Sequence, residues 1–223
     1  MKPAASPIAA VLFDMDGLLF DTERLFFRAM QAAGRQQGVN VPRALFNSLI
    51  GHTRERNFAL LREHYGTTFP AEEFHALCHS HLDDLLPGEL RLKPGAAELL
   101  DRLDALNLRR ALVTSSSRHS ACRNLAAFGL TGRFHQIVAH GDYRRGKPDP
   151  EPYLLAASRL QVEPARCLAL EDSFNGVRSA AGAGMRTVMV PDLLRPTPEM
   201  QRLCALIAPD LHAVQTLFER PGW

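Results

Sequence analysis

Short, mostly apolar segments alternate with longer segments of helical periodicity along most of this sequence, and the alternation limits what the chain can fold into. The predicted strands are residues 8–13, 110–114, 137–139, 167–171 and 186–190, and the helices of this part are 94–106, 120–128, 152–160 and 174–183. The first strand is apolar throughout, as expected for a strand buried on both faces. We therefore predict an α/β fold with a Rossmann-like, doubly wound parallel sheet.

Residues 22–91 interrupt this alternation directly after the first predicted strand. Helices are predicted from Thr22, as N-cap, to about Gly38, over 54–65, and over 70–86, where Pro87-Gly88 is expected to end the last one. No convincing strand occurs there. We therefore predict two domains: a core of residues 1–21 and 92–223, and an inserted, all-helical cap of residues 22–91.

Composition argues against several classes of protein. A net charge of +2, from 26 Lys+Arg and 24 Asp+Glu residues, gives little field to attract a nucleic acid. The four cysteines form no Cys-x-x-Cys pair, which argues against a zinc site or a disulfide scaffold. The apolar run at 8–13 is too short for a signal peptide or a membrane span. We expect a cytoplasmic monomer that binds neither nucleic acids nor membranes.

Polar side chains follow four of the predicted strands at the point where each strand ends. Ligands of open parallel sheets bind at these carboxyl ends, so the side chains there are the first candidates for a site. In strand order they are Asp14 and Asp16, Ser115 to Ser117, Lys147, and Glu171 with Asp172.

Each of these groups has an ordinary structural explanation when taken alone. Asp-x-Asp-Gly is common in turns, serines before a helix act as N-caps, and acidic residues suit a helix start. An isolated lysine in a loop is usually an exposed cation. Their joint occurrence at the ends of four strands is an improbable coincidence, and it predicts one catalytic site at this edge of the sheet.

Asp14-Met-Asp-Gly17, Ser115, Lys147-Pro148 and Glu171-Asp172 resemble the four motifs of the haloacid dehalogenase-like hydrolase superfamily. With a helical insert after the first motif, the chain is similar to the β-phosphoglucomutase-like and sugar-phosphate phosphatase branch. The resemblance covers nearly the whole chain. Its motifs are specific for the superfamily and much less so for the substrate.

The resemblance implies a Mg²⁺-dependent phosphatase that hydrolyses small phosphate monoesters, such as sugar, polyol or nucleoside monophosphates. Asp14 would be the nucleophile that forms an aspartyl-phosphate, and Asp16 the general acid and base. Asp14 and Asp172 would bind the metal directly, with the Asp16 carbonyl and Glu171 completing or orienting the shell. Lys147 would stabilise phosphate oxygens, and Ser115 would add a hydrogen bond. The residues expected to contact the substrate are Gly17, Leu18, Ser115, Ser116, Lys147 and Arg54.

Other activities of the superfamily agree less well with this sequence. Its dehalogenases lack the second aspartate of the first motif, which is present here as Asp16. Its phosphonatases use a lysine of the cap, and residues 22–91 contain no lysine. A non-catalytic phospholigand sensor on the same scaffold is a further alternative, but such a protein would be expected to lose Asp14, Asp16 or Lys147.

A phosphosugar mutase of the β-phosphoglucomutase type is the main alternative. Arg54 and Ser117-Arg-His119 resemble the residues with which these mutases bind a second phosphate. The mutases carry a histidine in the first cap helix, however, and Phe26 occupies that position here. We therefore favour a phosphatase. Arg54 stays open between an anion-binding residue and a solvated charge at a helix start.

Two histidines of the insert, His75 and His79, have the i, i+4 spacing of metal ligands on a helix. No third ligand is evident from the sequence. We interpret them as surface residues.

Overall fold

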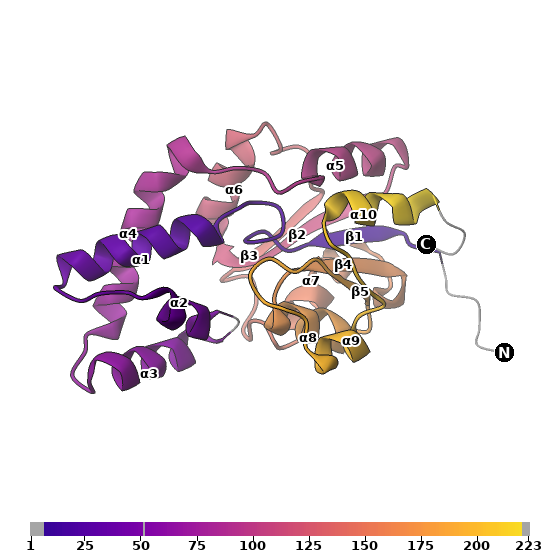
Figure 1. Cartoon of the computed structure of the whole chain (residues 1–223). Coiled ribbons are helices and arrows are strands. Elements are labelled where there is room, and N and C mark those ends of the chain that lie inside the picture. The colour runs from indigo at the N-terminus through magenta and orange to yellow at the C-terminus, as the bar shows by residue number, and fades with distance from the viewer. Residues whose placement is uncertain (1–6, 51, 220–223) are drawn as a thin grey trace. The chain divides into compact units, whose positions relative to one another are not determined.

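The computed structural model describes residues 7–50 and 52–219. Over these residues, six parallel strands form one sheet in the order β3-β2-β1-β4-β5-β6 (Figure 1). The strands are β1 (Ala10–Phe13), β2 (Arg109–Ser117), β3 (Gln136–His140), β4 (Cys167–Glu171), β5 (Arg186–Met189) and β6 (Leu206–Ile207). The predicted Rossmann-like parallel sheet is confirmed.

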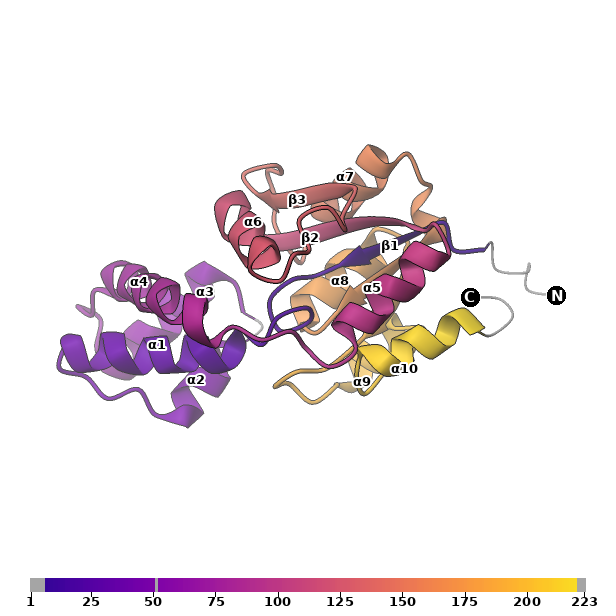
Figure 2. The ribbon, with the colours of Figure 1, turned by 90° about the horizontal axis from the view of Figure 1, so that it is seen from above.

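Helices cover both faces of this sheet. Figure 1 shows α5 and α10 on one face and α7 and α8 on the other. Seen from above in Figure 2, α5 and α10 lie side by side, in agreement with their direct packing. The helices of this part of the chain are α5 (Ala96–Ala105), α6 (Arg118–Ala127), α7 (Glu151–Leu160), α8 (Phe174–Gly182), α9 (Pro198–Leu203) and α10 (Leu211–Gln215), with 3-10 turns η1 (Pro164–Arg166) and η2 (Thr216–Glu219).

Strand β1 is the centre of the sheet and fixes the position of the loop that comes after it. All four of its residues are fully buried, which explains its uninterrupted apolar sequence. Phe13 is in register with Leu112 of β2 on one side and Leu170 of β4 on the other. The residue after β1 therefore emerges between β2, which continues to Ser117, and the end of β4 at Glu171, at the edge predicted to carry the site.

The chain divides into two compact units, one made of residues up to Phe20 and from Leu92 onward, and the other of Asp21–Arg91. The second begins one residue before the predicted start of the cap. Its described residues form α1 (Glu23–Gln36), α2 (Arg43–Leu49), α3 (Arg54–Tyr65) and α4 (Ala71–Glu89). It has a hydrophobic core of its own, which includes Met30, Phe46, Leu61 and Phe74.

Some local predictions were wrong. Helix α4 does not end at Pro87 but continues to Glu89. A proline in the last turn removes only one hydrogen bond, and buried Leu86 keeps this turn packed and accepts from the Leu90 amide. Helix α1 begins after Thr22, but the Thr22 side chain makes no capping hydrogen bond.

The elements absent from the prediction are short. Helices α2, α9 and α10 have 7, 6 and 5 residues and strand β6 has 2, too few for a hydrophobic period to be recognised. In the described part of the chain, no helix is both long enough and apolar enough to cross a membrane.

Candidate active site

The loop after β1 places Asp14 at the end of the sheet. The Asp14 amide donates to the Leu170 carbonyl at 3.0 Å, and the amides of Leu19 and Phe20 both donate to the Met15 carbonyl, which closes a tight turn. Gly17 in this turn has φ +80°, and a Cβ there would lie 2.3 Å from Asp172 Oδ2. The glycine of the motif is thus required both for the backbone conformation and for the approach of Asp172.

Lys147, from the loop after β3, lies against Asp14. Its Nζ donates to Asp14 Oδ1 at 2.5 Å, to Glu171 Oε1 at 2.6 Å and to the Val113 carbonyl at 2.9 Å. Only 6% of the Lys147 side chain is exposed. Three acceptors, one directly after β1, one within β2 and one at the end of β4, hold this ammonium in one position.

Glu171 is fully buried, and its carboxylate is bound by several donors. Besides Lys147, the Tyr153 hydroxyl donates to Oε1 at 2.7 Å and the Ser173 hydroxyl to Oε2 at 3.1 Å. Gly176, in the first turn of α8, makes room for it, since a Cβ there would lie 1.9 Å from the carboxyl carbon. Because these donors already occupy the Glu171 carboxylate, they favour a role in which Glu171 orients the metal site over one in which it binds the metal directly.

The charged groups of this cluster shift one another's pKa values. Burial raises the pKa of Asp14 to about 8, with the Glu171 and Asp16 carboxylates adding to the increase and Lys147 opposing it. Burial alone would lower the pKa of Lys147, but the carboxylates of Asp14 and Glu171 outweigh that effect and hold it above its usual range. Lys147 is therefore a permanent positive charge at neutral pH.

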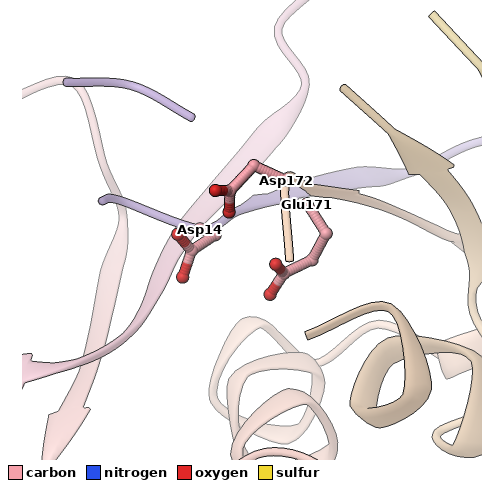
Figure 3. Close-up of side chains that lie close together, drawn as sticks. All are labelled: Asp14, Glu171 and Asp172. Carbon is pink, nitrogen blue, oxygen red and sulfur yellow. The ribbon is translucent and has the colours of Figure 1, made fainter. Parts of the chain in front are cut away.

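The site has the donors that a hard cation requires. One carboxylate oxygen from each of Asp14, Glu171 and Asp172 lies within 4.8 Å of the others. Figure 3 shows the carboxylates of Asp14 and Asp172 beside one another, while Glu171 extends in a different direction. Oxygen ligands of this kind suit Mg²⁺, which is typically held by one or two carboxylates and keeps several waters. Asp14 and Asp172 fit such an ion.

The carboxylate of Asp16 lies outside this oxygen group and contacts β2 instead. The Ser116 hydroxyl donates to Asp16 Oδ2 at 2.7 Å. Asp16 is partly exposed and Asp14 is buried, so the two aspartates of one motif have different environments. Ser115 is exposed, and Ser117 caps α6 by accepting from the Ser120 amide.

The remaining predicted residues are distributed more widely. The Leu18 side chain is fully buried, so only its backbone is available to a ligand. Arg54 belongs to the helical unit, where its side chain is 58% exposed and pairs with Glu55 at 3.7 Å. The structure thus brings Asp14, Lys147, Glu171 and Asp172 together, and places Asp16 with Ser116.

Sequence reasoning missed a further carboxylate beside the site. Asp192 follows β5, and its Oδ2 would lie 3.4 Å from a Cβ at Gly17. Lys93 donates to Asp192 Oδ1 at 2.8 Å, while Oδ2 is buried and has no hydrogen-bond partner among the described residues. The rule that identified the other strand ends applies equally to β5 and would have found Asp192. Tyr153, in the first turn of α7, does not follow a strand and gave no such signal.

Comparisons with known proteins agree with this geometry. A family model described as haloacid dehalogenase-like hydrolase matches residues 8–184. A phosphorylated carbohydrates phosphatase of Thermotoga maritima is 32% identical over 80% of this chain and 83% of that protein. (DL)-glycerol-3-phosphatase 2 of Arabidopsis thaliana is 32% identical over 83% of this chain and 80% of that protein.

A solved structure of a related protein is also similar to this chain. The crystal structure of a CbbY variant from Rhodobacter sphaeroides in complex with xylulose-(1,5)bisphosphate matches 92% of this chain and 95% of that chain, with a TM-score of 0.79 and 30% identity. The family resemblance inferred from the strand-end motifs is confirmed: the chain belongs to the haloacid dehalogenase-like hydrolase family.

Proposed function

We propose that this enzyme is a Mg²⁺-dependent phosphatase that hydrolyses small phosphate monoesters through an aspartyl-phosphate on Asp14. The observation that carries the proposal is the buried Asp14 carboxylate, held by the Lys147 ammonium at 2.5 Å beside the carboxylate of Asp172. A nucleophile, a fixed cation and a site for a hard cation occupy one strand edge, the combination needed for attack on an anionic phosphate.

Asp14 performs the first step as a nucleophile. Its carboxylate attacks phosphorus in line, the bond from phosphorus to the ester oxygen breaks, and the alcohol leaves. Lys147 fixes Asp14 Oδ1 and stabilises charge on the phosphate oxygens. Mg²⁺, held by Asp14 and Asp172, would neutralise part of the negative charge that otherwise keeps a carboxylate away from a phosphate.

Asp16 performs the proton transfers. Its acid form protonates the leaving oxygen, and its carboxylate then removes a proton from the water that attacks the aspartyl-phosphate. Ser116 donates to Asp16 Oδ2 and thereby orients the carboxyl group. The separate environments of Asp14 and Asp16 support two different roles.

The substrate class we propose is small phosphorylated metabolites, with phosphorylated sugars and polyols first. The relatives named for phosphorylated carbohydrates and for glycerol 3-phosphate support this class. Phe26, at the position where the mutases carry histidine, supports water over a sugar hydroxyl as the acceptor. It lies in the helical unit, where its ring packs against His79 with centroids 5.5 Å apart.

Replacing the nucleophile tests the proposal. Asp14→Asn is expected to lower Mg²⁺-dependent hydrolysis of p-nitrophenyl phosphate by at least about 1,000-fold, because the amide cannot form the phosphoenzyme. The matched control is Asp84→Asn, on the exposed face of α4, which should retain full activity. Circular dichroism checks that both variants fold. Substantial turnover by the Asp14 variant would contradict the mechanism.

Replacing the proton donor should have an effect that depends on the leaving group. For Asp16→Asn, we expect kcat/KM to fall about 10²–10⁴-fold with glycerol phosphate, whose alkoxide needs protonation. The loss with p-nitrophenyl phosphate should be much smaller, because p-nitrophenolate leaves without a proton. Equal losses of kcat/KM on the two substrates would show that Asp16 is not the general acid.

Binding of Mg²⁺ should depend on pH. With a pKa of about 8, Asp14 in the metal-free protein is protonated below that pH, and the ion has to displace this proton. The Kd for Mg²⁺ should therefore fall about tenfold per pH unit between pH 6 and 8 and then level off. Calorimetric titrations in buffers of different ionisation enthalpy measure both the Kd and the released proton. A Kd that stays constant over this range would contradict the protonated state.

A further inference from the structure

Two histidines on helix α4 of the cap lie together outside the site described above. His75 and His79 are separated by one helical turn and occupy the same face. Their Nε2 atoms are in hydrogen-bond contact at 3.1 Å, and their ring centroids are 4.4 Å apart. One imidazole nitrogen therefore donates to the other, and an ion bound by both would take the place of the proton between them.

This separation is the one required for chelation of a metal ion. A metal–imidazole bond is about 2.0–2.1 Å long, so two nitrogens 3.1 Å apart subtend an angle of about 98° at a shared ion. That angle lies between the ideal values of a square-planar and a tetrahedral site. An ion can bind both nitrogens without a change of the helix backbone.

Neighbouring helices restrain both rings. The His75 ring packs edge-on against Phe58 of α3, with centroids 5.5 Å apart. The His79 ring packs against Phe26 of α1, also at 5.5 Å. All four residues belong to the same compact unit. Because the rings are already ordered, binding an ion costs less side-chain entropy than it would on an isolated helix.

We propose that His75 and His79 form a chelating site for a late first-row transition metal ion, namely Ni²⁺, Cu²⁺ or Zn²⁺, separate from the Mg²⁺ site of the core. Imidazole nitrogen suits these ions, whereas Mg²⁺ prefers oxygen. Among the described residues, no third His, Cys, Asp or Glu ligand atom lies within 4.8 Å of both imidazoles. The remaining coordination positions are therefore open to water or to a small anion.

Charge around the pair has a modest effect. Arg54 lines the same cavity of about 280 Å³ as His75, and its positive charge opposes a cation. The Arg54 side chain is 58% exposed, so solvent screens this repulsion. Asp83 follows His79 on the same helical face and contributes the opposite charge. The two charges have opposite signs and therefore partly cancel at the pair.

Titration with Ni²⁺ tests the proposal. Tag-free protein, with excess Mg²⁺ to fill the carboxylate site, should bind one Ni²⁺ in calorimetry. His79→Ala is expected to weaken this binding by about 100-fold or more, because the second bond of a chelate forms at a high effective concentration. His81→Ala is the matched control on the same helix, and it should bind as the unmodified protein does. His79 is exposed, so its replacement leaves the core of the unit intact.

Cu²⁺ provides a second measurement that reports the ligands directly. The electron paramagnetic resonance spectrum of the protein should show coupling to two imidazole nitrogens, reduced to one in His79→Ala. Asp14→Asn should leave both readouts unchanged, which separates this site from the catalytic one. The proposal is overturned if His79→Ala binds Ni²⁺ as tightly as the unmodified protein, or if His81→Ala loses as much affinity.

Discussion

The ammonium of Lys147, buried between Asp14 and Glu171, is the interaction on which the rest of the site depends. Carboxylates this deeply buried are costly unless a cation and hydrogen bonds compensate them. The chain supplies both: Lys147 contacts Asp14, Glu171 and the Val113 carbonyl, and Tyr153 completes the shell of Glu171. Removing one partner of such a buried pair generally costs about 3–5 kcal/mol, so the cluster is also a structural element.

The cluster explains why lysine is used here in a chain rich in arginine. Of the 26 basic residues only Lys2, Lys93 and Lys147 are lysines. Lys93 and Lys147 both pair with carboxylates that follow strands, Asp192 and Asp14. A compact ammonium satisfies several acceptors converging on one point, where the planar fork of an arginine needs more room. The register of β1 between β2 and β4 brings these acceptors together.

The sequence predicted the features that have a strong physical signature. Buried parallel strands are apolar throughout, and β4 has the predicted bounds of Cys167–Glu171. Carboxylates at or directly after the ends of such strands identified Asp14, Glu171 and Asp172, which the structure groups within 4.8 Å. The burial of Leu18 and the pairing of Ser116 with Asp16 depend on how the turn after β1 packs, which no local pattern reveals. Asp192 was missed because the strand-end rule was not applied to β5.

The helical unit has a core of its own and contains the histidine pair that we propose as a metal site. From their spacing alone, His75 and His79 were interpreted as surface residues. Only the side-chain positions show that their Nε2 atoms are in contact at 3.1 Å. Phe26 bears both on the choice between phosphatase and mutase and on the proposed metal site. It occupies the position where the mutases carry histidine, and its ring packs against His79. The proposed metal binding by this unit can therefore be studied separately from the proposed chemistry at Asp14.

If the phosphoryl group passes through Asp14, it can be trapped there. Enzyme turning over a phosphate monoester with Mg²⁺ would be quenched rapidly in acid, digested and analysed by mass spectrometry. We expect one phosphoryl group on the peptide that contains Asp14, and we expect it to disappear when the quench is delayed until the substrate is exhausted. A phosphoryl group on a different residue, or none during steady turnover with the unmodified enzyme, would contradict this expectation.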